Sequence, residues 1–163
     1  MSETTPETPS GDEQGQKVPL TIHGQYIKDF SFEVPGAPQI FLDAPAGKPE
    51  MNLNLDVQVE GITDETFEVI LDIKAETKIA DKSAYIMELK YAGLFTIQVP
   101  ETHRAAVLFV ECARLLFPFA RSVLADISRD GGFQPLILGP IDFASLYEQN
   151  IEKIRDQTAE KKG

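Results

Sequence analysis

Hydrophobic and polar residues alternate along four segments of the chain, which is the period of half-buried β-strands. These segments are Leu20–Val34, Met51–Glu60, Phe67–Ile79 and Ala84–Ile97. Short connections join the last three segments, and such connections predict an antiparallel meander of hairpins. The connection over Pro35–Glu50 is longer and rich in Pro and Gly. We therefore expect it to cross over rather than to turn back tightly.

The alternation also assigns side chains to the two faces of the predicted sheet. In the first segment the alternation fails at Ile27–Lys28, where we expect a bulge or bend. The apolar face of that segment carries Leu20, Ile22, Tyr26, Phe30 and Phe32.

The polar face of the predicted sheet is acidic. Three isoleucines, Ile27, Ile70 and Ile86, lie among its charges. Apolar residues ringed by acids suit the docking of a basic partner, although a solvated face is the simpler interpretation. The charged residues of this face are Asp29, Glu33, Asp56, Glu60, Glu68, Asp72, Glu76 and Glu88, with Lys74, Lys78 and Lys90.

Two helices are predicted after the strands. The first runs from Glu101 to about Arg129, and the pair Gly131–Gly132 ends it. Pro118 removes a backbone donor inside this run, so we expect a kink or a split there. The run is apolar almost all round, which indicates that one side packs on the sheet and the other on a second subunit. The second helix starts near Asp142 as N-cap and continues to about Gln157.

These elements predict an α+β fold, with a four-stranded antiparallel sheet and both helices packed on one face. The irregular segment Phe133–Ile141 between the helices is unusually apolar. Loops normally keep their backbone in water, so this segment either packs under another element or forms the wall of an apolar groove.

The length of 163 residues suits one domain, predicted over residues 18–157. Residues 1–17 are acidic and poor in large apolar side chains, which predicts a disordered tail, and residues 158–163 should form a flexible end. The start of the chain lacks a basic, apolar leader, and no run is apolar enough to cross a membrane. We therefore expect a cytoplasmic protein that does not insert directly into the membrane.

The charge of the chain narrows its partners. Lys plus Arg number 15 and Asp plus Glu number 26, which gives a net charge of −11. A surface of this charge repels phosphate backbones and anionic lipids, so nucleic-acid binding is not expected.

Few residues suit catalysis. The lone cysteine, Cys112, excludes an internal disulfide, and its place in the apolar helix predicts a buried thiol. The two histidines, His23 and His103, are few for acid–base chemistry. The sequence contains neither a phosphate-binding glycine loop nor a Gly-x-Ser-x-Gly elbow. We therefore predict no catalytic residue, no metal ligand and no cofactor.

An enzyme nevertheless remains one alternative. A hot-dog-fold thioesterase also wraps an antiparallel sheet around a long apolar helix, and Glu101 and His103 would then be its candidate acid–base residues. The order of elements disfavours this alternative, because hot-dog proteins place the long helix early and this chain places it after all four strands.

Four segments of the chain carry a resemblance to a known family: Tyr26–Pro38, Leu116–Arg121, Gly132–Leu136 and Pro140–Phe143. They resemble the SecB family of bacterial protein-export chaperones, and the likeness spans roughly residues 18–150. The acidic start is similar to alphaproteobacterial forms. The resemblance implies an ATP-independent holdase that assembles as a homotetramer, a dimer of dimers. It would bind unfolded precursor proteins, keep them competent for translocation and deliver them to the SecA motor ATPase. A SecB-like chaperone serving a toxin–antitoxin pair is the second alternative.

The resemblance also implies roles for particular residues. The SecA-docking residues of the family correspond to Asp29, Glu33, Ile86 and Glu88. The oligomer interface is expected at Val107, Val110, Cys112 and Leu115. The end of the chain is basic, whereas the tails of the family that assist SecA binding are often acidic or rich in glutamine. The groove that binds clients is expected at Ile40, Phe41, Met51, Leu53, Leu55, Phe133, Leu136, Ile137, Phe143 and Tyr147.

Overall fold

The structure, a computed structural model, describes residues 19–43 and 47–160 and contains one antiparallel sheet. Its strands are β1 (Leu20–Glu33), β2 (Glu50–Gly61), β3 (Thr66–Ile79) and β4 (Lys82–Ile97). The order across the sheet is β1-β4-β3-β2, so β1 and β2 form the two edges although they follow each other in the chain. The predicted meander and the predicted crossover are both confirmed. The crossover contains a short 3-10 helix, η1 (Gln39–Phe41).

Strand β1 contains two irregularities in its pairing with β4. One lies between Ile22 and Gly24 and the other, which was predicted, lies between Ile27 and Asp29. Each bulge reverses the face on which the following side chains lie. Tyr26 therefore lies on the face opposite the helices and Ile27 on the helix face, so both predicted positions are wrong. Uninterrupted alternation assigns these two residues to the wrong faces, because it does not include the bulge between Ile22 and Gly24.

The hairpin between β3 and β4 is a tight two-residue turn. Ala80 and Asp81 have φ angles of 51° and 63°, and both residues therefore adopt the left-handed conformation. Such a turn matches the twist of the strands that it joins. The hairpin predicted over 80–83 is confirmed.

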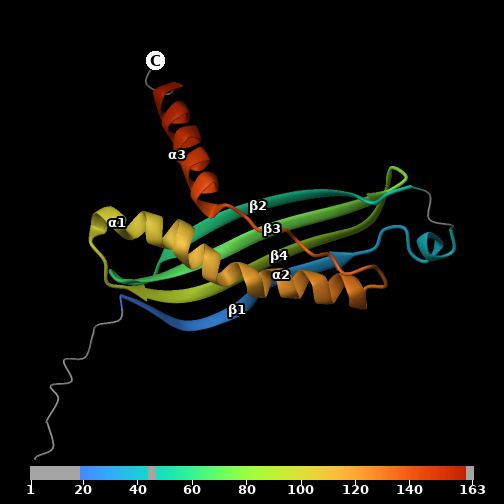
Figure 1. Cartoon of the computed structure of the whole chain (residues 1–163), viewed down its shortest axis with the longest axis horizontal. Helices are drawn as coiled ribbons and strands as arrows, with labels where there is room; N and C mark the ends of the chain where they lie inside the picture. Colours follow the sequence, from blue (N-terminus) through green and yellow to red (C-terminus); the bar gives the residue numbers. More distant parts are fainter. Residues whose placement is uncertain (1–18, 44–46, 161–163) are drawn as a thin grey trace, which may run out of the picture.

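One long helical run covers the centre of the sheet (Figure 1). It comprises α1 (Glu101–Ala106), a π-helical stretch, η2 (Val107–Cys112), and α2 (Ala113–Asp130). Gly93 of β4 lets the helix approach, because a Cβ atom there would lie 2.7 Å from Leu116 Cδ2. The fully buried side chains between the two layers include Leu71, Ile73, Met87, Leu89, Phe95, Leu116 and Leu124.

The helical run does not split at Pro118, which lies inside α2. Its irregular winding lies earlier, in η2. Pro118 and Arg114 are both exposed, so water can hydrate the Arg114 carbonyl that loses its partner. The predicted split at the proline is therefore wrong, and the alternative, a kink, stays a prediction.

The last helix, α3 (Phe143–Glu160), is fixed at its beginning. Asp142 is its N-cap, as predicted: its Oδ1 accepts the Ser145 amide at 3.1 Å and its Oδ2 accepts the Ser145 hydroxyl at 2.8 Å. Phe143 is buried, and its ring lies 5.7 Å from that of Phe117. Beyond this anchor α3 projects from the layered body instead of lying along the sheet as expected (Figure 1).

The α+β fold with a four-stranded sheet and a long helix agrees with the prediction. The acidic tail predicted over 1–17 lies outside the described residues, as do residues 161–163. Within the described ranges, no helix is long and apolar enough to cross a bilayer.

Candidate functional site

An apolar groove lies where the sheet extends past the end of α2. Its volume is about 710 Å³. Three parts of the chain line it: the hairpin ends of β3 and β4, the start of β2, and the residues that follow α2, here called the wall segment (132–136). The lining residues are Pro49, Met51, Thr77, Ile79, Tyr85, Gly132, Phe133, Gln134, Pro135 and Leu136.

A chain of four aromatic rings passes through this groove, and its two central rings, Tyr85 and Phe133, line it. Phe32 of β1 lies 5.7 Å from Tyr85 of β4, measured between ring centroids. Tyr85 lies 4.8 Å from Phe133, and Phe133 lies 5.4 Å from Phe41 of η1. Each such pair contributes about 0.5–1.5 kcal/mol beyond its buried area. The rings thus join four separate elements into one apolar surface.

The wall segment leaves α2 through a Schellman motif. Gly132 has a φ of +95°, which glycine adopts without strain. Its amide donates to the Arg129 carbonyl at 3.1 Å, and the Phe133 amide donates to the Ser128 carbonyl at 3.0 Å. These two bonds are the ones that define the motif. The helix end therefore turns Phe133 back toward the sheet.

The floor of the groove carries one polar group without a partner. Thr77 is buried, and its hydroxyl makes no hydrogen bond to any part of the chain that the structure describes. Buried hydroxyls are normally paired.

Only some of the predicted groove residues line the groove. Met51, Phe133 and Leu136 do, and Phe41 packs on the Phe133 ring at its edge. Ile40, Leu53 and Leu55 are half-buried and pack against the core.

Three other predicted groove residues lie elsewhere. Ile137 is 75% exposed and does not line the cavity, whereas Phe143 is 2% exposed and belongs to the core. Tyr147 of α3 stacks on Phe109 of η2 at 5.4 Å. Sequence reasoning missed Tyr85 and Ile79, because alternation places both on the apolar face but does not show where α2 stops covering that face.

A second hollow, of about 610 Å³, lies between the long helical run and α3. It includes Val107 and Val110, two of the residues expected at an oligomer interface, and also His103. Glu111 and Glu148 lie at this hollow too, whereas Glu101, the predicted partner of His103 in a thioesterase, does not line it.

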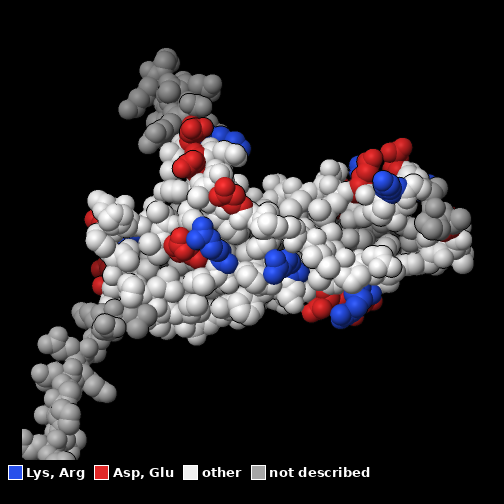
Figure 2. Space-filling view, in the orientation of Figure 1, with Lys and Arg blue, Asp and Glu red and all other residues white. Residues whose placement is uncertain are grey.

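The remaining two interface residues differ sharply in exposure. Cys112 is fully buried in the core of its own chain, and burial raises the pKa of its thiol to about 12. Leu115 is 43% exposed, and Phe119, one turn further along α2, is 52% exposed. Charged side chains lie at intervals along this side of the molecule (Figure 2). Leu115 and Phe119 form a local apolar patch on α2 in the single chain.

The opposite side of the sheet, here called the charged face, is ordered in rows across the strands. One row crosses all four strands from β2 to β1. Each residue in it lies opposite the next, in the order Asp56, Asp72, Lys90 and Asp29. The next two rows along β1 and β4 place Ser31 opposite Glu88 and Glu33 opposite Ile86. The four residues expected to dock a partner, Asp29, Glu33, Ile86 and Glu88, thus lie on one face in three adjacent rows.

Two lysines partly neutralise the charged face. Lys74 Nζ lies 3.0 Å from Glu88 Oε1, and hydrogen bonding to that carboxylate raises the pKa of Lys74. Lys90 Nζ lies 3.9 Å from Asp72 Oδ2. Ion pairs this exposed contribute little to stability, so the acids remain available to a basic partner.

One carboxylate of the charged face is buried. Glu68 of β3 is 7% exposed and accepts hydrogen bonds from the Tyr26 hydroxyl and the Lys28 ammonium group, both on β1. These side chains reach across β4 above Ala92, which is fully buried. Burial alone would raise the pKa of Glu68, but the two donors outweigh burial and lower it. Burial and the hydrogen bond to Glu68 raise the pKa of Tyr26 to about 12.

Comparison with known proteins gives consistent results. The family model described as "Preprotein translocase subunit SecB" matches residues 13–154. The chain is 45% identical over 159 residues to a protein of Rhodospirillum rubrum named "Protein-export protein SecB", covering 98% of this chain and 96% of that one. A protein of the same name from Paramagnetospirillum magneticum is 44% identical over 155 residues, covering 94% and 97%.

The fold also matches a solved structure. The Mycobacterium tuberculosis Rv1957 SecB-like chaperone, solved with a ChAD peptide from the Rv1956 HigA1 antitoxin, superposes with a TM-score of 0.63. The match covers 75% of this chain and 90% of that one at 17% sequence identity, so it supports the fold alone.

Proposed function

The chain belongs to the SecB family, and from that premise we propose that it binds unfolded precursor proteins in the apolar groove and hands them to SecA. The relatives at about 45% identity are protein-export proteins, which favours export over service to an antitoxin. SecB proteins are not a family of enzymes, and family membership likewise disfavours a thioesterase.

The observation that carries this proposal is the uncovered, ring-lined groove. Unfolded chains expose long apolar and aromatic stretches, and burying them contributes roughly 25 cal/mol per Å². Recognition of this kind depends on apolar surface rather than on a sequence motif. Clients that fold quickly hide such surface, so selection is partly kinetic.

Assembly would multiply these weak sites. We place the contact between copies at the exposed side of α2, around Leu115 and Phe119, and expect a tetramer built as a dimer of dimers. Several grooves on one particle would then hold one client through effective concentration. Binding of this kind needs no nucleotide, and we expect it to occur in the cytoplasm.

The charged face supplies a separate surface for SecA. Glu33 lies directly opposite Ile86, Glu88 lies one row further along the sheet and Asp29 two rows further, so an apolar contact stands at one end of a row of acids. Such a surface suits a partner with basic side chains beside an apolar one. Because this surface lies on the opposite side of the sheet from the groove, SecA can dock while a client is still bound. Docking of SecA would therefore precede release of the client.

The Phe133→Ala variant tests the groove directly. It removes the ring that contacts both Phe41 and Tyr85 and should weaken binding of an unfolded polypeptide about tenfold. Affinity would be measured by fluorescence anisotropy with a labelled 20-residue peptide rich in Phe, Leu and Lys. Ile62→Ser is the matched control, because Ile62 is an exposed apolar residue in the β2–β3 turn. Equal affinity of wild type and Phe133→Ala would contradict the assignment of this groove.

A further inference from the structure

We infer that Ser128 is a positioning residue of the groove, because it binds the amides of both Phe133 and Leu136 in the wall segment. The inference rests on the proposed function, since it concerns how the client groove is held in shape. It assigns to a fully buried side chain in the last turn of α2 a role outside helix packing.

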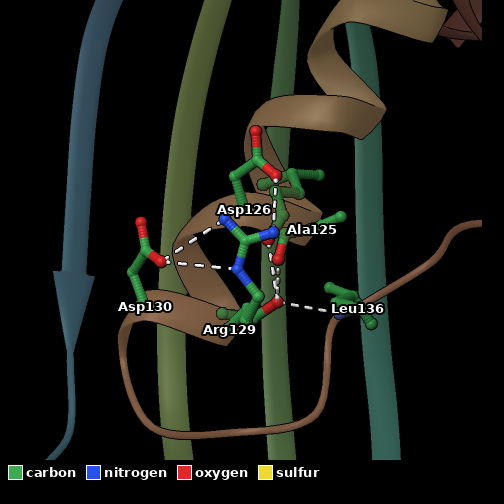
Figure 3. A network of polar contacts seen from close by, with 7 residues as sticks. Ala125, Asp126, Arg129, Asp130 and Leu136 are labelled. Carbon is green, nitrogen blue, oxygen red and sulfur yellow. Dashed lines mark hydrogen bonds and ion pairs between the residues drawn. The ribbon is translucent and has the colours of Figure 1, made fainter.

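Ser128 makes bonds in two directions. Its carbonyl accepts the Phe133 amide at 3.0 Å, and its Oγ accepts the Leu136 amide at 2.8 Å. The second bond is the dashed line that ends at Leu136 in Figure 3. The hydroxyl proton points back along the helix, where the Leu124 carbonyl lies at 2.9 Å and the Ala125 carbonyl at 3.0 Å. A hydroxyl has one proton to donate and two lone pairs with which to accept, so these roles are compatible.

The two amides that Ser128 holds belong to residues that line the groove. Phe133 and Leu136 both contact the cavity, and the wall segment between them is neither helix nor strand. A segment without a ladder of backbone bonds needs other partners for its buried amides. Ser128 supplies two of them and thereby sets how far the Phe133 ring and the Leu136 side chain stand from the sheet.

The charged residues beside Ser128 do not perform this task. Arg129 pairs with Asp126 at 3.5 Å and with Asp130 at 3.4 Å, and all three lie at the surface (Figure 3). Exposed pairs of this kind contribute little to stability, and these three residues belong to α2 itself. The side-chain connection from the helix to Leu136 is made by the serine hydroxyl.

The test uses Ser128→Ala in the full chain, with Cys112→Ala as control. Both substitutions remove one buried atom from the same helical run, but Cys112 lies in η2, before the start of α2, whereas Ser128 lies in the last turn of α2 next to the wall segment. Ser128→Ala leaves the Leu136 amide without its acceptor. We expect hydrogen exchange at the Leu136 amide to become about tenfold faster and the labelled peptide to bind about fivefold more weakly. Cys112→Ala should change neither quantity. Ser128→Cys keeps the shape but bonds more weakly, so it should give intermediate values.

Several results would decide the matter. Unchanged peptide affinity in folded Ser128→Ala would overturn the inference while leaving the client groove intact. If Ser128→Ala does not fold, hydrogen exchange in the wild-type protein still tests the inference. A Leu136 amide that exchanges as fast as the amide of exposed Ile137 would overturn the inference. If the wild type binds no peptide, the proposed function fails, whereas a protected Leu136 amide would still show the bond to Ser128.

Discussion

On the side of the sheet that carries the helices, scattered charged side chains stand in a mostly uncharged surface (Figure 2). The opposite side presents acids and lysines in regular rows across the strands. The groove on the first side is built from irregular backbone and aromatic rings, which can accommodate many sequences. The rows on the second side follow from strict strand pairing, which suits one folded partner. The same sheet thus supports a tolerant surface and a specific one.

The two sides also bury their polar groups differently. On the helix side Ser128 is neutral and bonds to backbone groups, so it shapes a loop. On the charged face Glu68 is ionised and bonds to two side chains of the edge strand β1, so it ties one strand to another. A buried charge is acceptable only with such donors, because desolvation would otherwise force it to neutralise.

The largest effect is expected where the apolar side meets another copy. Phe119→Asp places a charge where a half-exposed ring should become buried on assembly. Each ring occurs twice in a two-fold contact, so the variant loses the burial of two half-exposed rings, roughly 1.5–3 kcal/mol in all, and also buries two charges. Self-association should therefore weaken at least about 100-fold. Light scattering at micromolar concentration measures the change in mass.

Ile62→Asp is the control for this variant, because it charges another exposed apolar residue, in the β2–β3 turn away from α2. Thermal unfolding should show that both chains fold. A wild-type protein that stays monomeric, or a Phe119→Asp variant with unchanged mass, would contradict the proposed assembly.

A smaller effect is expected on the charged face. Glu88→Lys reverses one charge in the docking rows and should weaken SecA binding about tenfold, with a weaker dependence on salt. Client affinity should not change, because the groove lies on the other side of the sheet. Isothermal titration calorimetry at two salt concentrations would measure both quantities.

Asp64→Lys changes the net charge by the same amount in the β2–β3 turn, outside the docking rows. It should leave SecA affinity almost unchanged. Equal weakening by the two variants would mean that overall charge, rather than the ordered rows, governs docking.

The smallest effect concerns the pH dependence of stability. The pKa of Glu68 is lower in the folded chain than the ordinary value of 4.5. Its stabilisation is therefore complete above pH 4.5 and is lost as the pH falls through the folded pKa. Glu68→Gln should be less stable by about 1–2 kcal/mol at pH 7 and should lose less stability on acidification. Urea unfolding at several pH values measures the difference.

Glu60→Gln serves as the comparison, because Glu60 is an exposed carboxylate paired directly with Glu68 across the strands. It should keep the wild-type loss of stability in acid. If Glu68→Gln loses as much stability in acid as the wild type, the hydrogen bonds from Tyr26 and Lys28 do not favour the ionised form of Glu68.

Local pattern was enough to predict the strands, the meander, the crossover and the Asp142 cap, because each depends on residues close in the chain. It failed at Tyr26 and Ile27, since a bulge shifts alternation without a clear signal in the side chains. It also failed at Pro118, where exposure of the freed carbonyl to water makes the proline tolerable. The groove was predicted only in part, because the alternation places Tyr85 and Ile79 on the apolar face and does not distinguish them from ordinary core residues.

From its order of residues alone, this chain determines a sheet with an apolar and an acidic face, because a period of two assigns each side chain to a face whatever packs above it. Tertiary structure decides how far α2 covers the apolar face, which rings meet, and that Ser128 reaches Leu136. Those features depend on distances between elements far apart in the chain. Hydrophobic patterning does not encode such distances.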